Sequence, residues 1–220
     1  MQQQNTAQVL KDLQSPQNET RQQAEASLTQ MRQQQATQLL EEFVGLATGS
    51  IEASDAERAL ACVLLKKYFL DDRKEEQALQ QITAEQATVT KGAFKQSLNF
   101  GGDSLHLLRR KAEVICKLHR REESYGEIVQ EIQTLAQKPS SAGESVVKSK
   151  QFAMYALELL SEFHLPQEQI VQNKDNFMSL FSHSLQDTEI KVKVATLKSL
   201  AGFLTMFDDE DDVMKYKSMM

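Results

Sequence analysis

The fold is decided by the stretch Glu57-Arg-Ala-Leu-Ala-Cys-Val-Leu-Leu-Lys-Lys-Tyr-Phe-Leu70. From Ala59 to Leu65 every residue is apolar, and neither glycine nor proline interrupts the run. A helix that is apolar on all sides has to be covered by neighbours on more than one side. These seven residues are too few to span a bilayer, which takes about 20. We therefore predict a helix that is sandwiched between neighbouring elements.

The same pattern returns along the chain. A basic residue is followed three positions later by a small residue, and an apolar residue comes four positions after that. The copies are Arg21/Ala24/Leu28, Arg58/Ala61/Leu65, Arg109/Ala112/Cys116 and Lys150/Ala153/Leu157, with a looser fifth at Lys191/Val194. Their leading residues are 37 to 51 positions apart, and HEAT and armadillo repeats have periods of about 40–47 residues. Steps of three and four place the small and the large side chain on one helix face, where alanine lets the next helix approach closely.

The repeat and the composition predict an all-α fold, a right-handed HEAT-repeat α-solenoid of about five helical hairpins. Glycine (8) and proline (3) are scarce, and no segment alternates as a strand would. We expect one array over residues 1–220. Its hairpins are expected at 5–35, 36–70, 84–120, 125–163 and 167–207. Because the sequence stops on an apolar half-helix rather than on a polar capping repeat, we expect it to be the N-terminal piece of a longer protein.

Local signals place several helix boundaries. Capping boxes are predicted at Ser54–Glu57, Thr83–Gln86 and Ser124–Glu127. Asn18 and Asp187 are predicted to act as single N-caps.

Two further patterns concern the C-terminal part of the chain. The helix expected over 167–185 should be interrupted near Asn173. After it, a last helix is indicated by apolar residues at steps of four and three, namely Ile190, Val194, Leu197, Ala201 and Leu204.

Composition excludes several classes of function. The net charge of −6 and the pI near 5.3 argue against a protein that binds nucleic acid directly. The N-terminus has neither the charged start nor the apolar region of a secretory signal. Cys62 and Cys116 lie in apolar helix stretches, where we expect reduced, buried thiols, as in a cytosolic or nuclear protein.

No pattern of catalytic or metal-binding residues stands out. Cys116 and His119 are three positions apart, but two ligands do not make a zinc site. The acidic run 208–212 lacks the glycine of a calcium loop. A solvated linker is its default interpretation, and attraction to a basic partner is the alternative. We expect no enzymatic activity, no metal and no cofactor.

Two runs near the N-terminus carry a family resemblance. Asn18-Glu-Thr-Arg-Gln-Gln-Ala-Glu-Ala-Ser-Leu28 looks like Asn-x-x-Arg-x-x-Ala-Glu-x-x-Leu, and Arg58-Ala-Leu-Ala-Cys-Val-Leu-Leu-Lys-Lys67 is similar to Arg-x-x-Ala-x-x-Leu-Leu-Lys/Arg. Both patterns belong to the opening repeats of the importin-β (β-karyopherin) family of nuclear transport receptors. Leu108-Arg-Arg-Lys-Ala112 and Glu189-Ile-Lys-Val-Lys193 fall where repeats three and five of the importin 5 branch would lie.

The resemblance implies a receptor that moves between cytoplasm and nucleus through the nuclear pore. Such receptors carry cargo with nuclear localisation signals, bind phenylalanine-glycine nucleoporins on their outer helices, and release cargo when Ran-GTP docks on their second helices. By position these second helices are Glu19–Met31, Glu57–Leu70 and Leu107–Arg120. Their candidate residues for contact with Ran are Lys66, Lys67, Arg109, Arg110 and Lys111.

Two alternatives remain open at this point. The five basic residues could simply be the solvated ends of structural helices. The chain could also be a HEAT-repeat scaffold of another class, such as a phosphatase regulatory subunit or a vesicle-coat component. Such a scaffold would share the period but would have no reason to carry the two N-terminal runs.

Overall fold

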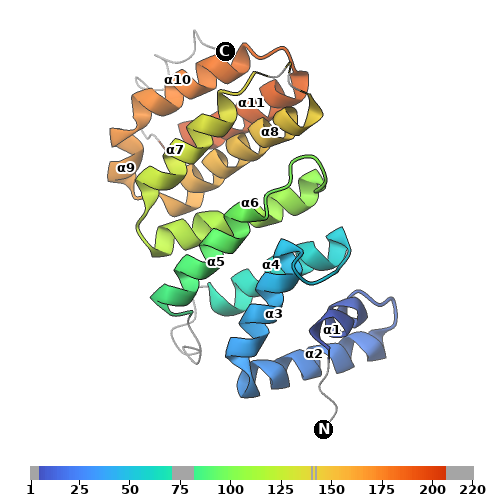
Figure 1. The fold of residues 1–220 in the computed structure, drawn as a ribbon. Helices are drawn as coiled ribbons and strands as arrows, with labels where there is room; N and C mark the ends of the chain where they lie inside the picture. The colour runs from blue at the N-terminus through green and yellow to red at the C-terminus, as the bar shows by residue number, and fades with distance from the viewer. Residues whose placement is uncertain (1–4, 71–81, 140, 142, 207–220) are drawn as a thin grey trace. The chain divides into compact units, whose positions relative to one another are not determined.

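The computed structural model describes residues 5–70, 82–139, 141 and 143–206, and all regular secondary structure in these ranges is helical (Figure 1). The helices of the first half are α1 (Thr6–Leu13), α2 (Asn18–Gln34), α3 (Ala36–Thr48), α4 (Asp55–Phe69) and α5 (Ala84–Gln96). Those of the second half are α6 (Leu105–Arg121), α7 (Tyr125–Ala136), α8 (Glu144–Leu159), the π-helix η3 (Leu160–His164), α9 (Gln167–Gln172), α10 (Lys174–Leu185) and α11 (Ile190–Leu204).

The chain divides into two compact units, Met1–Leu98 and Asn99–Met220. The hairpin expected over 84–120 therefore has its first helix, α5, in one unit and its second, α6, in the other. The expected single array over residues 1–220, and its continuation in a longer protein, remain predictions. The acidic run 208–212 lies outside the described residues.

In the first unit, α4 is the covered helix that its sequence predicts. It packs along α3 and also contacts α1. Ala61 and Leu65 are fully buried, and Phe69 meets Phe43 of α3 edge to face, with 6.3 Å between the ring centres. An apolar run without a solvent face is thus accommodated by neighbours on two sides.

The small residue of the repeat is buried in all four copies that have alanine. Ala24 is 4% exposed, and Ala61, Ala112 and Ala153 are 0% exposed. The prediction that these alanines face neighbouring helices is confirmed within each unit.

The fifth copy of the repeat does not follow this pattern. Val194 is 47% exposed, and Ile190 and Leu197 are 74% and 46% exposed. The helix α11 packs on α8 and α10 through its other face, which includes Val192 and Phe203. Both faces of α11 carry apolar side chains, so periodicity alone could not decide which one is buried.

Two of the three predicted capping boxes are confirmed. The Ser54 backbone N–H donates to Glu57 Oε2 at 2.7 Å, and the Glu57 N–H donates to Ser54 Oγ at 3.3 Å. Thr83 and Gln86 form the same reciprocal pair at 2.9 and 3.2 Å. Gly49 ends α3 in the left-handed conformation, with φ of 86°, a conformation that glycine adopts without steric cost.

The third box and both single caps are wrong. The Ser124 side chain makes no cap hydrogen bond, because its Oγ lies 2.8 Å from Nδ1 of His119 in the preceding helix. Asn18 is the first residue of α2 rather than its cap, and its side chain accepts a hydrogen bond from Arg21. The N-cap of α11 is Glu189.

The second unit is organised around α8, which packs against α6, α7 and α11. Its C-terminal end continues as the π-helix η3, which contacts α6 and α11. The break expected near Asn173 is confirmed, since α9 ends at Gln172 and α10 begins at Lys174.

Asp187 has a structural role in this unit that the predicted cap did not anticipate. Its Oδ2 accepts from the ammonium group of Lys150 on α8 at 2.5 Å, and both side chains are almost completely buried. Its Oδ1 accepts from the Glu189 N–H at 2.9 Å. The aspartate therefore ties the start of α11 to the repeat lysine of α8. Among the described helices, none has the length and apolar character needed to cross a membrane.

Candidate functional site

The first candidate surface is the C-terminal turn of α4. Lys67 is exposed there and Lys66 is half-buried. Two cations lie close to the neighbouring Tyr68 ring, with the Arg32 guanidinium carbon 5.1 Å and the Lys67 ammonium 5.4 Å from its centre. Burial raises the pKa of Tyr68, and Arg32 opposes that shift. The result is a basic, aromatic surface shared by α2 and α4.

The second candidate surface lies on α6 in the other unit. The Arg109 guanidinium carbon is 5.4 Å from the centre of the Tyr155 ring on α8. Arg110 donates to Glu113 Oε1 at 2.8 Å, and the Tyr155 hydroxyl donates to the same oxygen at 3.1 Å. Burial, followed by the charge of Glu113 and this hydrogen bond, raises the pKa of Tyr155 to about 12.

These contacts fix the geometry of both arginines. A guanidinium that stacks on an aromatic face keeps its N–H groups in one plane and loses little further side-chain freedom on binding. Arg109 is exposed and Arg110 is half-buried. Arg109 can therefore meet an acidic surface from a prearranged position, whereas Arg110 would have to share its charge with Glu113.

Lys111 differs from the other four candidates. Its side chain is fully buried, and its ammonium donates to Asp103 Oδ2 at 2.7 Å. A partner cannot reach it on the folded protein, so its role is to hold the start of α6. The candidates that lie at the surface are Lys66, Lys67, Arg109 and Arg110. The first two lie in one unit and the last two in the other.

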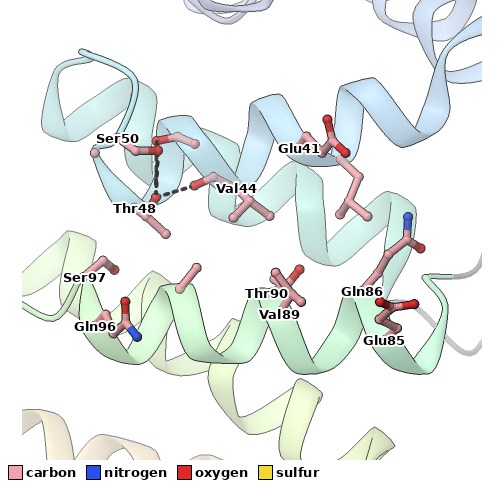
Figure 2. A pocket seen from close by; sticks show the side chains of 14 residues that line it. Glu41, Val44, Thr48, Ser50, Glu85, Gln86, Val89, Thr90, Gln96 and Ser97 are labelled. Carbon is pink, nitrogen blue, oxygen red and sulfur yellow. Dashed lines mark hydrogen bonds between the residues drawn. The ribbon is translucent and has the colours of Figure 1, made fainter.

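The first unit contains a groove that the sequence did not predict. A hollow of about 660 Å³ lies between α3 and α5 (Figure 2). Its middle is lined by apolar side chains, among them Val44 of α3 and Val89 of α5, and Val89 is 68% exposed. Ala93 of α5 contributes only a methyl group to the lining.

The two ends of the groove differ in chemistry. One end carries Glu41 of α3 and Glu85 of α5, both exposed. At the other end Thr48 donates to the Val44 carbonyl at 2.7 Å and lies opposite Ser97 (Figure 2). Lysine, arginine and histidine are absent from the residues that line the groove, so its charged end is purely acidic.

The described residues offer no metal centre. No group of three or more histidine, cysteine, aspartate or glutamate side chains among them could hold a metal ion. Cys62 and Cys116 are buried thiols that form no disulfide, as predicted. Burial, with a smaller contribution from Glu113, raises the pKa of the Cys116 thiol, which keeps this thiol protonated and unreactive at neutral pH.

Comparison with known proteins shows the fold. No protein-family model and no curated protein matches the chain. Among solved structures, yeast importin-β (Kap95p) matches 98% of this chain with a TM-score of 0.70 and 17% sequence identity. The match covers 26% of that chain, so the present chain spans about a quarter of its length.

The predicted fold class is therefore confirmed: the chain has an all-α HEAT-repeat solenoid fold like that of importin-β. The comparison does not support the importin 5 branch that repeats three and five suggested.

Proposed function

We propose that this chain is a segment of an importin-type nuclear transport receptor. In this proposal it binds Ran in the GTP-bound state and supports the transport of cargo with a nuclear localisation signal through the nuclear pore. The observation that carries the proposal is the match to importin-β over 98% of the chain. The proposal is supported independently by the two opening runs, Asn18–Leu28 and Arg58–Lys67. A HEAT repeat of any class requires only the apolar and small residues of such runs, so their other matches to the family patterns are not explained by the fold alone.

The surfaces proposed to contact Ran are the cationic faces of α4 and α6. Lys67 and Arg109 are exposed, and Lys66 and Arg110 are partly so. The chain as a whole is acidic, with a net charge of −6, so local basic surfaces are what would attract carboxylates of a partner. Of these four cations, Lys67 lies over the Tyr68 ring and Arg109 over the Tyr155 ring.

The other partners follow from the same proposal. Phenylalanine-glycine nucleoporins would bind outer helices of the receptor, and the receptor would move between cytoplasm and nucleus. We assign no residue of this chain to the nucleoporins or to the cargo. Enzymatic activity is not part of the proposed function.

The contact residues can be tested by charge reversal. Capture of Ran-GTP should be compared for the unmodified chain, the double variant Lys66→Glu/Lys67→Glu, and Arg109→Glu. Lys138→Glu is the matched control, because Lys138 is an exposed lysine that follows α7. Circular dichroism should show that every variant keeps its helical signal.

We expect the α4 and α6 variants to retain less Ran-GTP than the unmodified chain and the control to retain as much. Equal capture by all variants would remove these residues from the interface. A chain that captures no Ran in either nucleotide state would favour the HEAT scaffold of another class.

A further inference from the structure

The groove between α3 and α5 combines three properties that suit a linear peptide. It is apolar in the middle, acidic at one end and hydroxyl-rich at the other (Figure 2). Its volume of about 660 Å³ lies within the roughly 300–1,000 Å³ of typical ligand sites. Ligand sites of this kind use an apolar surface for affinity and a few polar groups for orientation.

The dimensions favour an extended segment over a helix. Helices that pack together have axes about 8–10 Å apart, and α3 and α5 are in contact. A whole helix, about 10–12 Å across, would have to lie above the hollow and could place only one of its faces in it. An extended chain can lie along it with alternate side chains pointing inward.

The charges select the sequence of that segment. Glu41 precedes Val44 by three residues on α3, and Glu85 precedes Val89 by four on α5. At 1.5 Å of rise per residue, the backbone positions of the two glutamates lie about 4.5–6 Å along the helices from those of the two valines. In an extended peptide, side chains on one face are about 6.5–7 Å apart at every second residue.

We propose that this groove binds an extended peptide segment in which an apolar residue and a lysine or arginine are separated by one residue. The apolar side chain occupies the space between Val44 and Val89, and the cation lies between Glu41 and Glu85. The hydroxyl-rich end, at Thr48 and Ser97, receives the polar backbone of the segment. This binding does not depend on contact with Ran.

The test uses the 220-residue chain and a defined probe. Binding of fluorescein-labelled Gly-Ser-Leu-Ser-Lys-Ser-Gly is measured by fluorescence anisotropy at low salt. Two further probes replace the lysine by glutamine or the leucine by serine. We expect the glutamine probe to bind about three- to tenfold more weakly, as the loss of one or two exposed ion pairs predicts. The serine probe should show no saturable binding.

Variants of the groove should give the complementary result. Glu41→Gln/Glu85→Gln should weaken the lysine probe to the level of the glutamine probe, and Val89→Lys should abolish binding. Glu168→Gln and Val171→Lys are the matched controls. They change an exposed glutamate and an exposed valine that are three residues apart on α9 of the other unit, and they should leave binding unchanged.

Two outcomes would overturn the proposal. One is equal binding of the lysine and glutamine probes, or tighter binding of an uncharged phenylalanine-glycine peptide. Either result would show that the glutamates do not make the groove prefer a cationic peptide. The other is the absence of saturable binding by the lysine probe up to millimolar concentration. Neither outcome bears on the binding of Ran, which is measured separately on α4 and α6.

Discussion

The Lys111 ammonium and the Asp103 carboxylate form a hydrogen-bonded ion pair at 2.7 Å, with side-chain exposures of 0% and 3%. Asp103 precedes α6 and Lys111 lies within that helix. The Asp103 backbone carbonyl also accepts from Lys148 at 3.1 Å. The pair therefore connects the start of α6 to its own second turn and to α8.

Removing one partner of this pair should be costly. We expect Lys111→Ala to lower the free energy of unfolding by about 3–5 kcal/mol, because it leaves the Asp103 carboxylate buried without its cation. Chemical denaturation monitored by circular dichroism measures this. Arg109→Ala is the control, because it removes an exposed cation next to the pair, and it should cost much less. Similar losses for both variants would contradict the buried position of Lys111.

Ala61 should not tolerate a larger side chain. It is 0% exposed on α4, so Ala61→Leu should lower the free energy of unfolding by about 1–3 kcal/mol through overpacking. The same change at Gln23, which is exposed on α2, should have little effect. Equal midpoints of thermal unfolding for the two variants would show that the assigned helix faces are wrong.

The two capping boxes should respond differently to acid. The hydrogen bonds from the Ser54 side chain and backbone lower the pKa of Glu57. This cap therefore stabilises α4 at pH values above the pKa of the unfolded chain, near 4.5, and the contribution disappears as pH falls through the lower folded value. The Thr83–Gln86 box has no titrating group.

Hydrogen exchange of the two cap amides measures this difference. Between pH 6 and pH 3, the protection of the Ser54 amide, corrected for intrinsic exchange, should fall more than that of the Thr83 amide. A parallel loss at both amides would indicate general acid unfolding rather than titration of Glu57.

Tyr155 should ionise later than an ordinary tyrosine. Its pKa is raised from 10.0 to about 12, chiefly by burial and then by Glu113. Because the folded protein favours the neutral phenol, this stabilisation is complete below pH 10 and is lost as pH rises toward 12. In an ultraviolet titration, the difference between the unmodified chain and Tyr155→Phe should appear mostly above pH 11. A difference that is complete near pH 10 would show that the phenol is solvated.

Local features were predictable from the sequence, and features that depend on distant neighbours were not. The capping boxes at Ser54 and Thr83 each form within four consecutive residues, so the sequence pattern is sufficient to predict them. Ser124 has the same pattern, but His119 from the preceding helix engages its side chain. The buried face of α11 was likewise decided by packing on α8, because apolar residues occupy both of its faces.

For the candidate surfaces, too, local features could be predicted from the sequence and contacts between distant residues could not. The motif that resembles importin-β identified Lys66 and Lys67, which do lie at the surface. It could not show that Lys111 pairs with Asp103, eight residues earlier, inside the protein. The groove was missed because it requires knowing that α3 and α5 are neighbours. In the sequence the groove corresponds to two apolar helix faces, one through Val44 and one through Val89. Periodicity cannot distinguish an apolar face that lines a groove from one that is buried in the core.

The proposed recognition of Ran in its GTP-bound state is tested most directly by a calorimetric titration of the unmodified chain. Ran loaded with a non-hydrolysable GTP analogue and Ran loaded with GDP are titrated separately into chain shown to be folded by circular dichroism. We predict saturable binding to the GTP-analogue form with an affinity at least about tenfold higher than for the GDP form, a difference of about 1.4 kcal/mol. Equal affinities, or no binding to either form by the folded chain, would contradict the account.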